Sequence, residues 1–139
     1  MIRWLLGGLA LFDVVLGGSA ALLPATFAEV VWPIADPAAQ QLIRRTGAIW
    51  LVFAAAETAA CLRPSCAFRL RLVACLRLLD VPADSVWLAF GSGWSGFGLG
   101  ALISAPPFNL LVGLLCWRAA DRAAQSAPSG SGSPPCRSR

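Results

Sequence analysis

Four long stretches of hydrophobic residues alternate with short segments that contain proline, glycine or arginine. Each stretch holds about 20 residues, the length at which a helix crosses the hydrocarbon core of a bilayer. The expected spans are residues 4–23, 42–62, 72–90 and 99–117. The pattern predicts an all-α fold, a four-helix transmembrane bundle built by residues 1–122. Because residues 123–139 are rich in Ser, Gly and Pro, they are expected to form a disordered cytoplasmic tail.

The first stretch opens with Arg3 and has some features of a secretory signal peptide. Its length and the presence of Asp13 favour a retained membrane helix instead. Gly17 and Ala21 follow Asp13 at four-residue intervals, so they lie on the same helical face. A stripe of small residues of this kind favours close contact with another helix.

The connection between the first two spans carries helix signals of its own. Pro24 is expected to end the first helix, and Thr26 opens a capping-box pattern. A short interfacial helix or turn is therefore predicted on the outer side, at residues 26–32. Asp36 followed by Pro37 is a favourable helix start, so the second helix should begin before its membrane-embedded part.

Prolines within the third and fourth stretches predict interruptions. Pro82 is expected to kink or break the third helix, because proline removes a backbone hydrogen bond and crowds the preceding turn. The fourth helix is expected either to start near Leu99 or to begin anew at Pro106 and Pro107. A glycine-rich hairpin at residues 91–98 should connect the two helices.

Composition and charge support a membrane protein. Of the 139 residues, 58% are hydrophobic and 13% are charged, whereas a soluble domain is typically about 25% charged. The net charge of +4 is too small and too dispersed for a nucleic-acid surface. If the N-terminus lies inside, only Arg44 and Arg45 fall on the outer side, so the positive-inside rule predicts that both termini are cytoplasmic. The inner side then holds Arg3, Arg63, Arg69, Arg71, Arg118, Arg122, Arg137 and Arg139.

The sequence contains no motif typical of catalysis or metal binding. It lacks histidine, the commonest metal ligand and the usual proton relay near neutral pH. Cys61 and Cys66 do not have the spacing of a zinc-binding pair. The glycine-dense residues 91–100 lack the lysine of a phosphate-binding loop, and their serines have no histidine for a triad. We therefore assign no catalytic residue, metal or cofactor, and nothing favours an enzyme.

Each hydrophobic stretch carries a strongly polar side chain near its middle. At a rise of about 1.5 Å per residue, these side chains lie roughly 9 to 15 Å from the inner boundary. Ionisable groups in hydrocarbon are costly unless they are paired, so we expect them to meet. Arg77 can pair with Glu57 across two helices, or locally with Asp80 three residues later. The expected intramembrane network is Asp13, Glu57, Arg77, Asp80 and Asn109, with Asp84 as its outer extension.

This network has two interpretations, and the sequence leaves both open. In the structural one, Glu57 and Asp80 neutralise Arg77. Asn109 then forms hydrogen bonds across the bundle, and the network only sets helix register. In the functional one, Asp13, Glu57 and Asp80 carry two more negative charges than Arg77 neutralises. At least one carboxyl group should then hold a proton or a cation.

Several local patterns also point to a known family. They are the glycine-rich first helix at 6–8 and 16–18, the proline-bounded segment at 23–37, Arg45-Thr46-Gly47, and Pro106, Asn109 and Gly113 in the fourth helix. Over about residues 1–120 the chain resembles the DoxX-like group of small four-span bacterial membrane proteins. Residues 80–84 depart from that pattern. The resemblance implies a multi-pass protein of the bacterial inner membrane and carries no active-site residue.

The sequence thus predicts a small integral membrane protein with an accessory or transport-type role, whose network binds a proton, an ion or a small polar group. An alternative is a subunit of a membrane redox system that binds a quinone or a partner subunit, which the resemblance also implies, because some DoxX-like proteins resemble subunits of quinone-linked or redox complexes. An intramembrane enzyme acting on lipid is least supported, because no nucleophile and base are paired. The expected partners are the lipid bilayer and either a second copy or another membrane subunit, with no nucleic acid.

Overall fold

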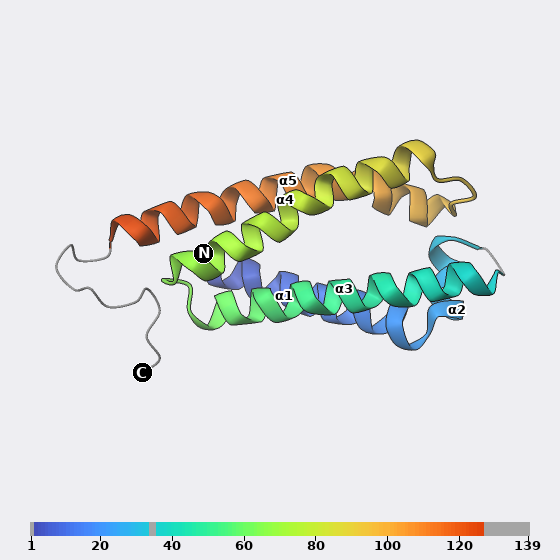
Figure 1. Cartoon of the computed structure of the whole chain (residues 1–139), viewed down its shortest axis with the longest axis horizontal. Coiled ribbons are helices and arrows are strands. Elements are labelled where there is room, and N and C mark those ends of the chain that lie inside the picture. The colour runs from blue at the N-terminus through green and yellow to red at the C-terminus, as the bar shows by residue number, and fades with distance from the viewer. Residues whose placement is uncertain (1, 34–35, 127–139) are drawn as a thin grey trace.

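The computed structural model describes residues 2–33 and 36–126, and these form five α-helices and no strand (Figure 1). The helices are α1 (Ile2–Leu22), α2 (Pro24–Val31), α3 (Pro37–Leu62), α4 (Ala67–Phe90) and α5 (Gly96–Gln125). The predicted all-α class is confirmed.

The four long helices form two packed pairs. α1 packs along α3, α4 packs along α5, and α3 meets α4 where the pairs come together (Figure 1). α1 begins, α3 joins α4 and α5 ends at one end of the molecule, which we call the N-terminal end. The short α2 lies at the opposite end, where it contacts α1, α3 and α5.

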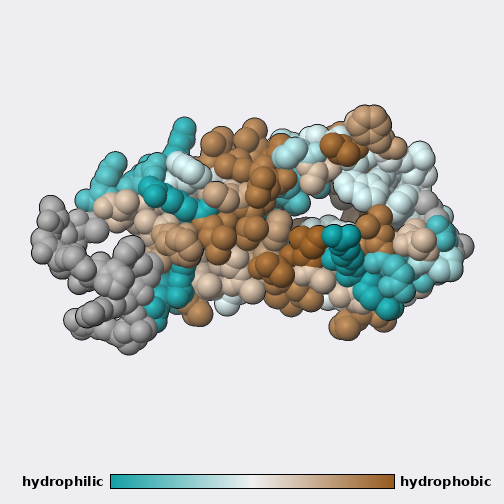
Figure 2. All heavy atoms as spheres, viewed as in Figure 1, coloured by the Kyte–Doolittle hydropathy of each residue, from teal (hydrophilic) through white to brown (hydrophobic). Residues whose placement is uncertain are grey.

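Three of these helices, α1, α3 and α5, are long and apolar enough to cross a membrane, which indicates a membrane protein. Large hydrophobic side chains such as Phe12, Leu79 and Leu111 are exposed along the helices. Figure 2 shows hydrophobic residues gathered over the middle of the molecule and hydrophilic residues toward its ends. α4 has 24 residues, but the charges within it keep its composition from marking it as a span.

The observed starts of α2 and α3 agree only in part with the starts predicted from the capping residues in the sequence. Asp36 caps α3 as predicted, since its Oδ1 accepts a hydrogen bond from the Ala38 N–H at 3.0 Å. The short helix before it is also present, but it begins at Pro24 instead of residue 26. The capping box at Thr26 is therefore not used, because proline suits the first helical position, where no N–H partner is needed.

The helices are not broken at proline, whereas the predicted kink at Pro82 stays a prediction. Of the two predicted starts of the fourth helix, the one near Leu99 lies close to the observed start at Gly96. α4 continues through Pro82, and α5 continues through Pro106 and Pro107. Neighbouring helices can hold a proline-containing helix together when both sides of the proline are packed. In α4, polar side chains on either side of Pro82 are bound to other helices, as described below. The predicted hairpin at 91–98 is shorter, because α5 already begins at Gly96, capped by Ser95.

The far end of α5 also differs from the expected domain boundary. The helix continues to Gln125, past the tail start expected at residue 123. The remainder of the predicted tail, residues 127–139, lies outside the described part of the chain.

Two hydrophobic clusters lie on either side of the polar residues. The larger one, at the N-terminal end, draws side chains from all four long helices: Leu6, Leu9, Ala60, Leu70, Val73, Ala74, Val112, Cys116 and Ala120. The smaller one, toward α2, consists of Ala20, Ala28 and Ile43. The polar side chains predicted as a network occupy the helix turns between these clusters.

Candidate functional site

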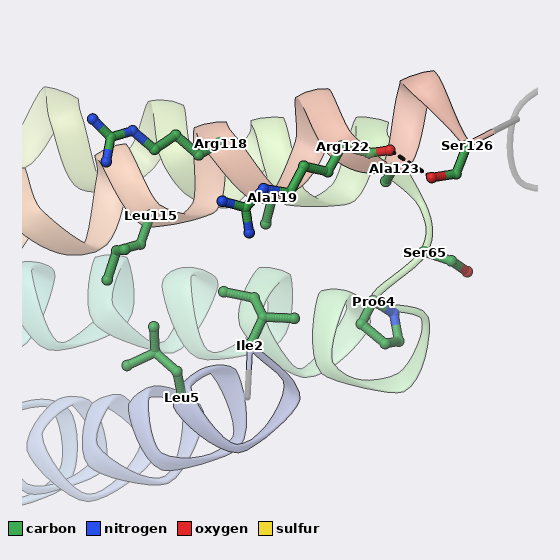
Figure 3. Close-up of a pocket in the computed structure, with 10 residues that line it drawn as sticks. All are labelled: Ile2, Leu5, Pro64, Ser65, Leu115, Arg118, Ala119, Arg122, Ala123 and Ser126. Carbon is green, nitrogen blue, oxygen red and sulfur yellow. Dashed lines mark hydrogen bonds between the residues drawn. The ribbon is translucent and has the colours of Figure 1, made fainter.

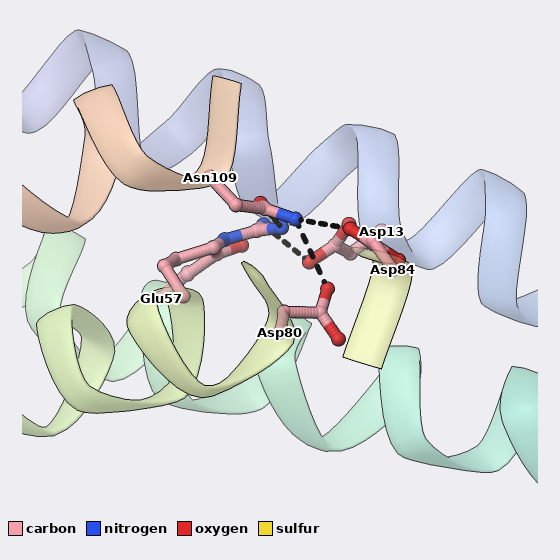
Figure 4. A network of polar contacts seen from close by, with 6 residues as sticks. Asp13, Glu57, Asp80, Asp84 and Asn109 are labelled. Carbon is pink, nitrogen blue, oxygen red and sulfur yellow. Dashed lines mark hydrogen bonds and ion pairs between the residues drawn. The ribbon is translucent and has the colours of Figure 1, made fainter. Parts of the chain in front are cut away.

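Arg77 of α4 lies at the centre of a polar network that joins all four long helices (Figure 4). Its Nε and Nη2 donate to Glu57 Oε1 of α3 at 2.8 and 2.5 Å. Nη2 also donates to Asp13 Oδ2 of α1 at 2.6 Å, and Nη1 donates to Asn109 Oδ1 of α5 at 3.2 Å. The planar guanidinium suits this task, because its donors point in several fixed directions.

Asn109 connects the arginine to a second pair of carboxyl groups. Its Nδ2 donates to Asp80 Oδ2 at 3.1 Å and to Asp84 Oδ2 at 3.0 Å. The two aspartates lie one turn apart on α4 and are half-buried. The amide oxygen faces a cation and the amide nitrogen faces two acids, so Asn109 has only one favourable orientation.

The centre of the network is almost completely removed from solvent. Asp13 and Glu57 are 1% exposed, and Arg77 and Asn109 are 3% exposed. Burial of a charged group costs several kcal/mol unless a partner compensates for it. The ring of Phe53 adds a contact of another kind, because its centroid lies 5.5 Å from Arg77 Cζ, within the range of a cation–π interaction.

Negative charge exceeds positive charge in this network. The network contains four carboxyl groups, those of Asp13, Glu57, Asp80 and Asp84, and a single guanidinium; Asp13 and Glu57 contact it directly, and Asp80 and Asp84 are linked to it through Asn109. Within the described residues, Arg77 is the only cation that forms an ion pair with any of them. If all four were ionised, the network would carry a formal charge of −3.

One buried oxygen has no hydrogen bond. Among the described residues, Glu57 Oε2 finds no donor, although Oε1 of the same carboxyl group accepts two hydrogen bonds from Arg77. An unsatisfied buried acceptor costs about 1–3 kcal/mol, and more if it carries charge. In Glu57, therefore, no hydrogen bond offsets the cost of removing the second carboxyl oxygen, Oε2, from water.

The local sequence places each polar residue on the buried stripe of its helix. Asp13 follows Leu9 by four residues, and Arg77 follows Val73 by four, so each shares a face with a core side chain. Gly113 lies four residues after Asn109 on the face that meets α4. A Cβ on Gly113 would lie 2.7 Å from Leu78 Cγ, so its absence lets α5 approach α4 closely beside Asn109.

The structure brings together all six residues that the sequence singled out, but their pairing differs in one respect. Within the described residues, Arg77 makes no ion pair with Asp80, although the two are three residues apart. The guanidinium instead contacts Glu57, Asp13 and Asn109 on other helices, and Asp80 binds the Asn109 amide. Phe53 was missed, although its position four residues before Glu57 on the same face was a usable signal.

Away from the network, three tryptophans connect α2 to the α4–α5 connection. Trp32 stacks on Trp94 at 5.1 Å between ring centroids, and Trp87 meets both rings edge-on. Trp32 Nε1 also donates to Ser92 O at 2.8 Å. A shallow cavity of about 400 Å³ lies beside this cluster. These contacts link α2, which packs on α1 and α3, to the α4–α5 pair at the end opposite the N-terminal end.

The donor groups of the described residues do not form a metal site, since no three His, Cys, Asp or Glu side chains are suitably grouped there. Comparison with protein families, characterised proteins and solved structures found no match for this chain. The DoxX-like resemblance therefore stays a prediction.

Replacement of Asn109 by leucine is expected to lower the free energy of unfolding by about 1–3 kcal/mol. The change removes hydrogen bonds to Arg77, Asp80 and Asp84 and leaves polar atoms without a partner. Unfolding of the purified protein in detergent would measure the loss. Ser104→Ala on the same helix is the matched control, because Ser104 bonds only to its own helix. An equal response of the two variants would show that the amide link contributes nothing.

Proposed function

We propose that this chain is a four-span integral membrane protein in which the network around Arg77 takes up and releases a proton, in an accessory or transport-type role. The observation that carries the proposal is the excess of carboxyl groups over cations among the buried and half-buried side chains. A membrane-embedded site with a formal charge of −3 is unfavourable. Each proton bound by a carboxyl group reduces that negative charge by one without any change in packing.

The fourth span in this proposal is α4. Its 24 residues are long enough to cross the hydrocarbon core. Its charged residues Arg77, Asp80 and Asp84 bind other helices, while Leu72, Leu79 and Val86 are exposed. A span whose polar groups face the protein interior and whose apolar groups face outward is compatible with lipid.

The orientation and the membrane are part of the same proposal. Both termini are placed in the cytoplasm, because arginine is concentrated at the N-terminal end of the molecule. The bacterial inner membrane is proposed from the resemblance to DoxX-like proteins. The N-terminal end then lies at the cytoplasmic surface, and the tryptophan cluster lies near the outer surface.

A proton is favoured over a larger ion by the geometry of the donors. Asp80 and Asp84 share one amide nitrogen, and Asp13 and Glu57 share one guanidinium nitrogen. Their oxygen atoms are thus arranged around nitrogen donors, and no set of them surrounds a space suited to a metal ion. Glu57 Oε2, which lacks a hydrogen-bond partner within the described residues, is the atom at which we place the proton.

The variant that tests this role is Glu57→Gln, which keeps the shape of the side chain and removes its acidity. Wild-type protein in vesicles is expected to show the infrared carbonyl band of a protonated carboxyl group, and a proton flux above that of empty vesicles. Both signals should be lost in Glu57→Gln. Glu29→Gln is the matched control, because Glu29 is an exposed carboxyl residue on α2.

The competing interpretation is that the network only fixes helix packing. It predicts that Glu57→Gln alters the unfolding free energy and nothing else, and that wild-type vesicles conduct no more protons than empty ones. Absence of the protonated-carboxyl band from the wild-type protein, at every pH at which it stays folded, would refute the proposed site. Recovery of the chain within a larger membrane complex would favour the accessory role over transport.

A further inference from the structure

A groove at the N-terminal end lies apart from the polar network. It has a volume of about 690 Å³ and lies between the start of α1, the last turns of α5 and the α3–α4 connection (Figure 3). Its walls are largely apolar and include Ile2, Leu5, Leu115 and Ala119. Cavities of about 300–1,000 Å³ are typical of sites for small ligands.

Two arginines line the same groove. Arg118 and Arg122 are one turn apart on α5, and both are exposed. In Figure 3 the Arg122 guanidinium reaches into the space between α5 and Ile2 of α1, while Arg118 extends along α5. The groove therefore combines apolar walls with positive charge along one side.

Neither guanidinium has a partner within the described part of the chain, where no ion pair or hydrogen bond involves the side chain of Arg118 or Arg122. The hydrogen bond drawn in Figure 3 runs from Ser126 Oγ to the backbone carbonyl of Arg122, at 2.9 Å. Nearby arginines are engaged, since Arg69 donates to Ala59 O at 2.7 Å and Arg71 pairs with Asp121 at 3.1 Å. The positive charge beside the groove is thus available to a ligand.

We propose that the groove binds one anionic phospholipid, with its phosphate against Arg122 and Arg118 and an acyl chain along Ile2, Leu5 and Leu115. Arginine is well suited to phosphate, because its parallel N–H groups match two phosphate oxygens. In the proposed orientation the groove lies at the cytoplasmic surface, where anionic lipids attract basic residues. The inference uses that orientation and is independent of proton binding by Glu57.

The segment that follows Ser126 is the other candidate occupant. Residues 127–139 contain no aspartate or glutamate, and their charged side chains are Arg137 and Arg139. Their side chains bring no negative charge to Arg118 or Arg122. Charge complementarity therefore favours the lipid.

The test measures binding of phosphatidylglycerol to the purified full-length chain in neutral detergent, by native mass spectrometry and by the shift in melting temperature. The wild-type protein should retain phosphatidylglycerol in preference to phosphatidylcholine and should melt at a higher temperature with it. The double variant Arg118→Gln/Arg122→Gln should bind about 30-fold more weakly, because each arginine near an anionic surface contributes about a fivefold increase in affinity. Inorganic phosphate should cause no comparable shift.

Two further variants separate this site from general attraction between charges. Arg44→Gln/Arg45→Gln removes the same charge from the opposite end of the molecule, where both arginines are exposed, and should leave binding unchanged. Ala119→Leu keeps both arginines but narrows the groove, and should weaken retention. Equal loss in both double variants, equal binding of both lipids, or full binding by Ala119→Leu would overturn the proposal. Glu57→Gln should bind lipid normally, so failure here is distinguishable from failure of the proton site.

Discussion

Replacement of Arg77 by leucine is expected to lower the free energy of unfolding by about 3–5 kcal/mol, the largest effect of any single change that we predict. The guanidinium is the only cation, among the described residues, that pairs with Asp13 and Glu57. Without it, two carboxyl groups that are 1% exposed lose their partner while they remain buried. Equilibrium unfolding in detergent, followed by circular dichroism, would measure the change.

The loss of stability in Arg77→Leu should come from buried carboxylates that no longer have a cationic partner, and a combined variant tests this cause. Arg77→Leu combined with Asp13→Asn and Glu57→Gln is expected to recover much of the stability, because the two carboxyl groups that had been paired with Arg77 can then no longer ionise. Asp80 and Asp84 keep their hydrogen bonds to the Asn109 amide. The free energy of unfolding of Arg77→Lys should lie between those of wild type and Arg77→Leu. A lysine ammonium group is a single point of contact, whereas the planar guanidinium bonds to the two carboxyl groups and also to Asn109.

An exposed ion pair provides the matched control. Arg71 and Asp121 also join α4 to α5, but their side chains are 49% and 45% exposed. Arg71→Leu should therefore cost about 1 kcal/mol or less. If Arg77→Leu unfolds at the same detergent or denaturant concentration as wild type, the network does not hold the helices together.

The second large effect is expected at the contact between α1 and α3. A Cβ placed on Gly47 would lie 2.6 Å from Ala21 N and 2.7 Å from Gly17 O, closer than real Cβ atoms approach such groups. Backbone atoms cannot move aside as a flexible side chain can. Gly47→Ala should therefore push the two helices apart and cost about 1–3 kcal/mol, with a larger loss for Gly47→Val.

The control for this contact is Gly18→Ala on α1, where an added Cβ would meet no atom within 4 Å. This variant should be neutral or slightly stabilising, because alanine favours the helix over glycine by about 1 kcal/mol. Unfolding of both variants under the same conditions gives the comparison. A similar stability for Gly47→Ala and Gly18→Ala would be inconsistent with a close α1–α3 contact.

The contact at Gly47 also bears on the polar network. Asp13 lies one turn from Gly17 on α1, and Glu57 lies on the same α3 helix as Gly47. If these helices separate, Asp13 and Glu57 cannot both stay within hydrogen-bond distance of one guanidinium nitrogen. Gly47→Val is therefore expected to disturb the network indirectly, as a change in the infrared signal of the carboxyl groups.

Some features of the fold followed directly from the sequence. The apolar stretches predicted the long helices, since lipid and protein interiors both favour uninterrupted helices of this length. The start of α3 at Pro37 was predictable because capping by Asp36 depends on neighbouring residues only. The continuity of α4 through Pro82 was not predictable, because it depends on contacts that α4 makes with other helices.

The sequence by itself determined that the chain is helical and which polar side chains need partners, because buried charge is too costly to leave unpaired. It also placed these side chains at similar depth, since depth follows from the number of residues along a helix. Only the tertiary structure decided which groups meet. Pairing depends on how each helix is rotated and how closely it approaches its neighbours. Those quantities arise from packing between residues far apart in the sequence, at contacts such as Gly47 with Gly17 and Gly113 with Leu78.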